Sequence, residues 1–294
     1  MHEEDGADRG FSTCSQQSVR AYPGRVRPPL SKDTRLCISL AARPSNIGTR
    51  FHNHLYDVLG LDFLYKAFTT TDIAAAIGGV RALGIRGCSV SMPFKEAVIP
   101  LVDVVEDSAR AIGSVNTIVN DGDRLTASNT DYIAVRRLVD PLERTPFVLH
   151  GSGGMAKAVA TALVDAGFPS GTVVARNDAA GRELAEALGL TFVPSTEGVT
   201  APLVVNATPI GMTGGSHAAD LAFPTSTVEA ASAVLDVVAL PALTPLVLAA
   251  RVAGKHVISG AEVIALQAAE QFEKYTGVRP TPEQVAEASA VSRG

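Results

Sequence analysis

The chain has 294 residues, of which 46% are hydrophobic and 19% charged, and its formal net charge is −5. This length and composition predict a core-forming protein of about two domains, and the negative charge argues against a nucleic-acid-binding surface. Three widely spaced cysteines, Cys14, Cys37 and Cys88, fit neither a disulfide framework nor a metal site, so we expect reduced thiols, no metal and a cytoplasmic location. No apolar run is long enough to span a membrane and no signal peptide is recognisable, so we expect no membrane association.

The first predicted elements form an α/β pattern. Residues 1–33 lack periodicity and are rich in Gly, Ser, Arg and Pro, which predicts a disordered tail or a wrongly assigned start of the chain. Strands are then expected at 35–40, 62–68 and 88–91, with helices from Ser45-Asn46 to Gly60 and from Thr71 or Asp72 to about Gly84. This alternation predicts a parallel sheet with helices on both faces.

Two further signals follow the third strand. Pro93 is expected to start a helix, because proline is favoured at the first helical position. Asp121-Gly122 lies between the apolar runs 115–119 and 125–128 and predicts a β-hairpin.

Residues 147–177 predict a dinucleotide-binding βαβ unit. The apolar run 147–149 precedes the turn Gly151-Ser152-Gly153-Gly154, a helical pattern and a second β-rich run at 172–175. Gly151-x-Gly153-x-x-Ala156 fits the G-x-G-x-x-G/A form, in which backbone N–H groups at the helix start bind a pyrophosphate. Because the chain has 26 glycines, a purely structural strand-to-helix turn is the alternative.

The end of the second strand of this unit bears on the choice of cofactor. It reads Arg176-Asn177, without an acidic residue at the tip. An acid there would bind the ribose of NAD, whereas an arginine can pair with the 2′-phosphate of NADP. The sequence therefore favours NADP, while Asp178, just beyond Asn177, leaves NAD open.

We expect two α/β domains. Residues 34–131 with 262–294 would form a substrate-binding and catalytic domain, and residues 132–261 a Rossmann-type dinucleotide-binding domain with further strands at 203–207, 233–238 and 256–259. The last predicted helix, 262–277, should cross back to the first domain and bring Gln267 into the cleft.

Polar residues gather where three predicted strands end, at 89–95, 114–117 and 128–131. Ligands bind beyond the carboxyl ends of parallel strands, and these side chains suit a small polyhydroxylated substrate. Lys95 and Asp131 could handle the proton that accompanies hydride transfer at an alcohol carbon. From the residues alone, a solvated surface lysine and an ordinary Asn-Thr-Asp turn or cap remain open.

Six motifs occur in an order that resembles the shikimate dehydrogenase family. They are Ser-x-Pro-Phe-Lys at 91–95, Val-Asn-Thr at 115–117, Asn-Thr-Asp at 129–131, Gly-x-Gly-Gly-x-x-x-Ala at 151–158, Asn-Ala-Thr-Pro-x-Gly-Met at 206–212 and Gln-Ala-x-x-Gln-Phe at 267–272. Arg-Pro-Ser-Asn-Ile-Gly at 43–48 and Asn-Thr-Asp-Tyr at 129–132 look most like its shikimate dehydrogenase-like branch. The resemblance implies an NADP-dependent oxidoreductase that interconverts 3-dehydroshikimate and shikimate, on the route to chorismate and aromatic amino acids.

The resemblance also implies roles for single residues. Lys95 and Asp131 match the family's catalytic pair. The substrate-binding positions would be Asn46, Ser91, Asn116 and Gln267. The cofactor-binding positions would be Gly151, Ser152, Gly153, Gly154, Met155, Arg176, Asn206, Ala207 and Thr208. The implied partner is a small shikimate-like hydroxy acid, bound by a monomer or homodimer.

Several positions depart from the family pattern. Asn46 and Gly48 stand where the family has two serines that bind the substrate carboxylate, and Ala239 replaces a substrate-contacting tyrosine. Glu262 and Tyr132 replace glycines, and Ala175 replaces the asparagine before the cofactor arginine. Our leading hypothesis is a dehydrogenase of shikimate or a close analogue; a quinate-type dehydrogenase of different specificity and a non-catalytic sensor of nucleotide or metabolite remain open.

Overall fold

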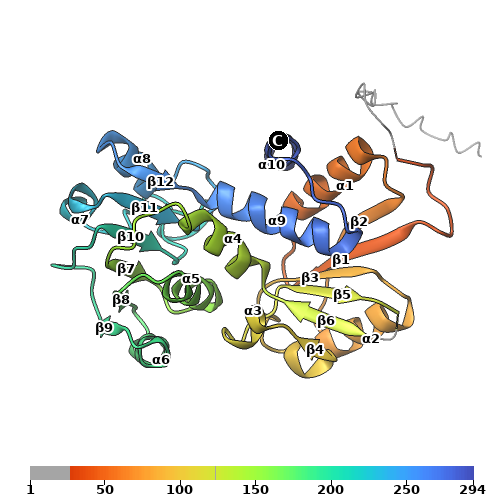
Figure 1. Cartoon of the computed structure of the whole chain (residues 1–294), viewed down its shortest axis with the longest axis horizontal. Coiled ribbons are helices and arrows are strands. Elements are labelled where there is room, and N and C mark those ends of the chain that lie inside the picture. The colour runs from red at the N-terminus through yellow and green to blue at the C-terminus, as the bar shows by residue number, and fades with distance from the viewer. Residues whose placement is uncertain (1–26, 123) are drawn as a thin grey trace, which may run out of the picture.

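The computed structural model describes residues 27–122 and 124–294, which form two six-stranded sheets connected by two helices (Figure 1). Of the expected tail, residues 1–26 lie outside the described residues. In the described remainder, Arg27 forms an ion pair with Asp57 at 3.2 Å and donates to Asn53 Oδ1 at 2.8 Å, so the chain makes tertiary contacts before residue 34. No helix in the described ranges is long and apolar enough to cross a membrane.

The first sheet is mixed and has the strand order β2-β1-β3-β5-β6-β4. Its elements and their connections are β1 (Arg35–Ala41), α1 (Ile47–Leu59), β2 (Phe63–Thr69), α2 (Ile73–Ala82), β3 (Gly87–Val90), η1 (Ile99–Leu101), β4 (Val104–Val105), α3 (Asp107–Arg110), β5 (Thr117–Asn120) and β6 (Leu125–Ser128). Strands β1, β2 and β3 are parallel, as expected. The predicted hairpin is confirmed as β5 and β6, and because it joins the same sheet antiparallel to β3, the sheet is not wholly parallel.

The second sheet is parallel throughout and has the order β12-β11-β10-β7-β8-β9. Its elements are β7 (Phe147–His150), α5 (Gly154–Asp165), β8 (Gly171–Val174), α6 (Asp178–Leu188), β9 (Thr191–Val193), β10 (Leu203–Asn206), α7 (Thr225–Ala230), β11 (Ala233–Asp236), α8 (Pro245–Val252) and β12 (His256–Ile258). The chain order reverses between β7 and β10, which is the switch point where Rossmann-like sheets bind dinucleotides. The predicted βαβ unit is confirmed as β7, α5 and β8.

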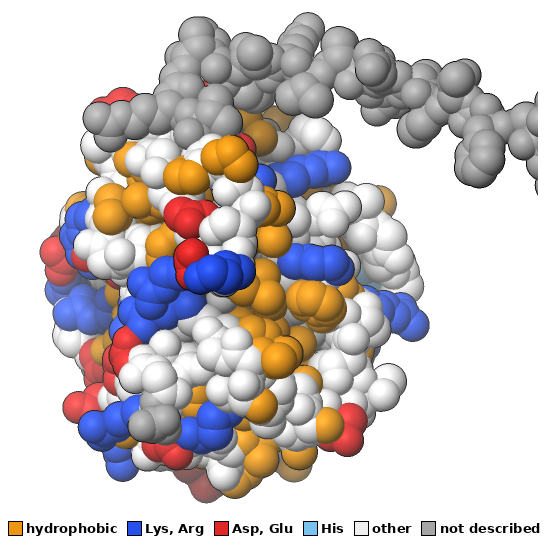
Figure 2. Space-filling model, turned by 90° about the vertical axis from the view of Figure 1, so that its right-hand side faces the viewer, with side chains coloured by type: hydrophobic (Ala, Val, Ile, Leu, Met, Phe, Trp, Pro, Cys, Tyr) orange, Lys and Arg blue, Asp and Glu red, His pale blue; other side chains and the backbone are white. Residues whose placement is uncertain are grey.

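Helices α4 (Thr130–Val139) and α9 (Gly260–Thr276) carry the chain from the first sheet to the second and back (Figure 1). Arg137 of α4 forms an ion pair with Glu270 of α9. The predicted domain limits, 131/132 and 261/262, fall in the first turns of these two helices and remain predictions. Figure 2 views the molecule from the first-sheet end, where basic and acidic side chains are interspersed with apolar ones.

The last two helices complete the core of the first sheet. Helix α9 and α10 (Pro282–Arg293) pack on α1. The side chains of Phe51 and Leu55 from α1 and of Phe272 and Tyr275 from α9 are at most 1% exposed and belong to one apolar cluster. The predicted crossing of helix 262–277 is thereby confirmed for α9, whereas α10 was not predicted and the place of Gln267 in the cleft stays a prediction.

Candidate functional site

Lys95 and Asp131 lie in direct contact, although 36 positions separate them in the chain. Lys95 Nζ donates to Asp131 Oδ2 at 2.7 Å. The two side chains are 21% and 9% exposed, so the ion pair is largely shielded but open to solvent at the lysine. A solvated surface lysine would not be buried to this extent, so the geometry agrees with a pair that works together.

The backbone around Lys95 is held by the segment before β5 rather than by a helix. We expected a helix to start at Pro93, and this is wrong: residues 92–98 form turns, and only Ile99–Leu101 is a short 3₁₀ helix. The carbonyl of Lys95 accepts from Val115 N at 2.8 Å, and Ile99 N bonds to Glu96 O at 3.2 Å rather than to Lys95 O. The turns contain one helical bond, from Val98 N to Phe94 O at 3.1 Å, but the ladder does not continue, and Lys95 is tied to the segment before β5.

Asp131 occupies the first turn of α4, which begins directly after β6. Asn129 caps this helix, because its Oδ1 accepts from Tyr132 N at 3.0 Å. The other end of the same amide donates to Ser114 O at 2.8 Å. The Asn-Thr-Asp motif is thus both a helix cap and the support of a buried carboxylate, two readings that the sequence alone had set against each other.

Asn116 lies beside this pair with its amide held in one orientation. Its Oδ1 accepts from Thr130 N and from Thr117 Oγ1, both at 2.8 Å. The carbonyl end is therefore used internally, and Nδ2 is the group left for a ligand.

Helix α9 contributes two glutamines to the region, of which only Gln267 was predicted to bind substrate. Gln267 is partly buried on α9. Gln271, one turn further and 3% exposed, donates to Thr117 Oγ1 at 2.9 Å and to Ser89 Oγ and Asn116 O at 3.2 Å. It stood in the Gln-Ala-x-x-Gln-Phe motif at helical spacing from Gln267, which was the available signal that both lie on one face.

The predicted positions Asn46 and Ser91 lie on exposed segments that follow β1 and β3. These segments are joined through Ala42 N, which donates to Met92 O at 3.3 Å. Asn46 precedes α1, but its side chain forms no capping hydrogen bond. Its amide therefore does not cap the helix, which is the usual role of an asparagine at this position.

The glycine turn of the second sheet has the geometry that a dinucleotide requires. Gly151 has a φ of +132°, and a Cβ there would lie 2.7 Å from Ala207 O, so no other residue fits. A Cβ on Gly153 would meet nothing within 4 Å, so the turn is open to a ligand at this residue. Helix α5 starts without a side-chain cap or an acidic residue in its first turn, which leaves its N–H groups and positive dipole end for an anion.

Other positions predicted to bind the cofactor lie in this turn or after β8. Ser152 and Met155 are partly buried within it. Arg176 is exposed at the end of β8 and forms no hydrogen bond or ion pair with other described residues. Asp178 belongs to the first turn of α6 and lies 4.0 Å from Arg182, so it does not occupy the strand tip.

The loop after β10 is held by a buried polar network. Asn206 Nδ2 donates to Asp236 Oδ1 at 3.0 Å, and Asn206 Oδ1 accepts from Thr208 N at 3.0 Å. Burial raises the pKa of Asp236. Its carboxylate accepts a hydrogen bond from Thr244 Oγ1 at 2.5 Å. Ala207 N donates to His150 O at 2.8 Å, so Asn206, Ala207 and Thr208 lie directly beside the glycine turn.

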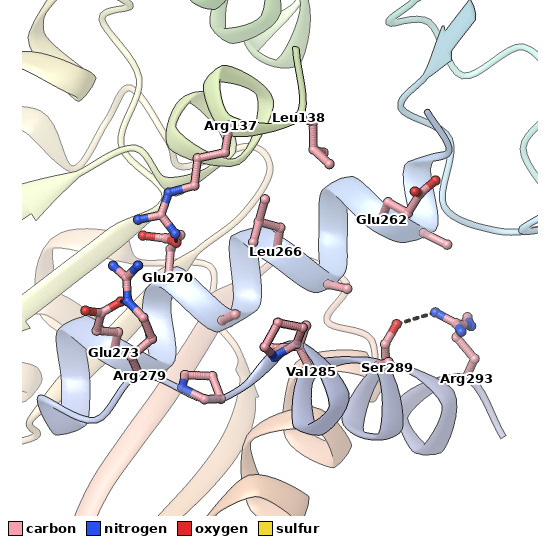
Figure 3. A pocket seen from close by; sticks show the side chains of 16 residues that line it. Arg137, Leu138, Glu262, Leu266, Glu270, Glu273, Arg279, Val285, Ser289 and Arg293 are labelled. Carbon is pink, nitrogen blue, oxygen red and sulfur yellow. Dashed lines mark hydrogen bonds and ion pairs between the residues drawn. The ribbon is translucent and has the colours of Figure 1, made fainter. Parts of the chain in front are cut away.

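A groove of about 650 Å³ lies elsewhere, along α4, α9 and α10 (Figure 3). Leu138, Leu266 and Val285 give it apolar walls, and the Glu273–Arg279 ion pair at 2.9 Å lies at its edge. Its lining includes neither the Lys95–Asp131 pair nor the glycine turn, so it is separate from the candidate site.

Comparison with known proteins identifies the family. Residues 46–118 match the model of the shikimate dehydrogenase substrate binding domain. The chain is 54% identical over 267 residues to a shikimate dehydrogenase-like protein of Haemophilus influenzae, covering 90% of this chain and 98% of that protein.

Solved structures agree in fold over nearly the whole chain. A shikimate 5-dehydrogenase-like protein superposes with a TM-score of 0.87 at 54% identity, covering 90% of this chain and 100% of the other. The Thermus thermophilus shikimate 5-dehydrogenase in complex with NADP(H) and shikimate gives 0.77 at 30% identity, with 88% and 99% covered. The Corynebacterium glutamicum quinate dehydrogenase in complex with NAD gives 0.80 at 27% identity, with 88% and 98% covered. By its sequence and its fold, the chain belongs to the shikimate dehydrogenase family.

Proposed function

We propose that the protein is an NADP-dependent oxidoreductase that acts on the CH–OH group of shikimate or a closely related cyclic hydroxy acid. The observation that carries the proposal is the 2.7 Å contact between Lys95 and Asp131 at the junction of the two sheets. A shielded lysine–carboxylate pair beside a dinucleotide turn is the arrangement that alcohol oxidation needs, because hydride and proton leave adjacent atoms.

The chain's own residues would perform the proton part of the reaction. The nicotinamide, when bound, would supply the hydride acceptor or donor. Lys95 would take the hydroxyl proton in oxidation or return it to the alkoxide in reduction. Asp131 would hold the amine in place through Nζ and orient the substrate hydroxyl, while Asn116 Nδ2 and Gln267 would bind the other hydroxyls.

The residues of the second sheet fit a dinucleotide and favour NADP. The open turn at Gly153 and the uncapped start of α5 suit a pyrophosphate. Arg176 is exposed and not paired with another described residue, so its guanidinium is available to the 2′-phosphate, as relatives with bound NADP(H) lead us to propose.

The cofactor preference can be tested at Arg176. A charge-assisted hydrogen bond contributes about 1.5–3 kcal/mol, so Arg176→Ala should weaken NADP binding roughly 10- to 150-fold and leave NAD binding almost unchanged. Dissociation constants for both nucleotides, measured by calorimetry on wild type and variant, would decide. If the ratio of the NADP and NAD dissociation constants were the same in the variant as in wild type, Arg176 would not belong to the cofactor site.

The substrate itself is tested by a steady-state assay. Shikimate, quinate and related hydroxy acids should be offered with NADP and with NAD, and the highest kcat/KM identifies the activity. Asn46 and Gly48 stand where the family pattern has two serines that bind the substrate carboxylate. A quinate-type activity is therefore the main alternative. Tight NADP binding without turnover of any hydroxy acid would instead favour the non-catalytic sensor.

A further inference from the structure

An ion pair joins the two sheet regions directly beside the candidate catalytic lysine. Lys157, in the first turns of α5, donates from Nζ to Glu96 Oε1 at 3.4 Å. Glu96 follows Lys95 in the chain, so the cofactor-side helix is connected to the loop that carries Lys95. The lysine and glutamate side chains are 31% and 66% exposed, and exposed pairs of this kind are weak.

The start of α5 touches the other support of Lys95 as well. A Cβ on Gly154 would lie 3.6 Å from Ser114 Oγ. Ser114 is 1% exposed, and its Oγ has no hydrogen-bond partner among the described residues. The next residue, Val115, donates its N–H to Lys95 O at 2.8 Å. The first turn of α5 is therefore packed against the segment that fixes the Lys95 backbone.

The same turn is where a dinucleotide pyrophosphate would bind. Lys157 is the only charged side chain in the sequence Gly154–Thr161. Side chains on a helix lean toward its N-terminus, so the ammonium of Lys157 leans toward the glycine turn. A pyrophosphate at that turn would attract Lys157 more strongly than a single, solvated carboxylate does.

We propose that Lys157 is shared between Glu96 and the cofactor: it pairs with Glu96 in the free protein and with the pyrophosphate when a dinucleotide is bound. Glu96 then competes with the cofactor for Lys157. Binding of the dinucleotide releases the ion pair beside Lys95, and so couples occupancy of the cofactor site to the loop that carries the catalytic lysine. This inference rests on the dinucleotide site of the proposed function.

Removal of the Lys157 charge and removal of the Glu96 charge are expected to have opposite effects on NADPH binding. NADPH dissociation constants, measured from the fluorescence of the nucleotide without substrate, should rise about 10-fold in Lys157→Gln. They should fall about 2- to 5-fold in Glu96→Gln, because the lysine is then available. In the double variant Glu96→Gln should have no further effect. Lys66→Gln and Glu143→Gln remove the same charges from exposed positions outside the turn and should leave binding unchanged.

The dependence of the Glu96→Gln effect on Lys157 separates this proposal from general electrostatics. Removal of any nearby negative charge would also strengthen anion binding, but that gain would persist in the Lys157→Gln background. A persistent gain, an unchanged Lys157→Gln variant or weaker binding by Glu96→Gln would each overturn the proposal while leaving the dinucleotide site intact. If wild type bound neither NADPH nor NADH, both the coupling and the proposed function would be wrong.

Discussion

At the scale of single residues, the Lys95–Asp131 contact makes the most direct prediction. Lys95→Ala should lower kcat by about 10²–10⁴-fold with little change in NADP affinity, because it removes the proton-transfer group and not a cofactor contact. Asp131→Asn should lower kcat and also weaken substrate binding. Since the two groups touch at 2.7 Å, their losses should be less than additive in the double variant.

A surface lysine of the first sheet provides the control for this experiment. Lys66 is exposed on β2, and Lys66→Ala should retain wild-type kinetics. Near-normal kcat in Lys95→Ala would show that Lys95 has no part in proton transfer and would strengthen the sensor hypothesis.

We expect Asn46 and Gly48 to limit how well a shikimate-like carboxylate is bound. A Cβ on Gly48 would lie 3.5 Å from the Tyr65 ring, an ordinary contact, so a serine fits there. The variant Asn46→Ser/Gly48→Ser would return both family hydroxyls and should lower the KM for shikimate by about 10-fold or more. If shikimate kinetics stayed unchanged while another hydroxy acid lost activity, the natural substrate would not be shikimate.

At the scale of elements, the glycine turn can be divided into a folding role and a binding role. Gly151→Ala places a Cβ 2.7 Å from Ala207 O at a φ of +132°, and should destabilise the fold by at least about 2 kcal/mol. Gly153 has an extended φ of −79° and open space, so Gly153→Ala should fold normally but weaken NADP binding.

Urea unfolding followed by circular dichroism, together with NADP titration, would separate the two effects. Circular dichroism is the suitable probe because the chain has no tryptophan. Equal stability of the Gly151→Ala and Gly153→Ala variants would contradict this division.

Sequence patterns predicted most strands and helices because their periodicities are local. The helix expected at Pro93 is replaced by turns in which the carbonyl of Lys95 is bonded to Val115 N, a contact across 20 positions that no local pattern records. The site followed the same rule: motifs pointed to Lys95, Asp131 and Asn116, while the buried hydrogen bonds of Gln271 and the Lys157–Glu96 pair depend on how distant segments fold together.

At the scale of the whole molecule, a buried histidine links stability to pH. His52 is 0% exposed, its ring stacks on Tyr65 at 4.3 Å between centroids, and burial lowers its pKa to about 3. Below the unfolded value of 6.5 the unfolded chain binds a proton that the folded protein excludes. Stability is therefore fully present above about pH 6.5 and falls as the pH falls toward 3, by about 2 kcal/mol between pH 7 and 5 for this group alone.

His52→Phe should keep the ring packing and remove this part of the pH dependence. The free energy of urea unfolding at pH 7 and pH 5 measures it, with His256→Asn as an exposed control that leaves the slope unchanged. A variant as acid-sensitive as wild type would show that other groups, such as His150, whose pKa burial also lowers, govern the slope.

The packing of α9 and α10 on α1 has a consequence for synthesis on the ribosome. Strands β1 to β6 emerge first, but the apolar faces of Phe51, Leu55 and Tyr56 are covered only when Phe272, Tyr275 and Ala288 have been translated. The intervening Rossmann-like segment is continuous in sequence and can fold during this interval. The core of the first sheet therefore stays incompletely covered until α9 and α10 have been translated. During this time the first half of the protein is the part most exposed to aggregation and to chaperones.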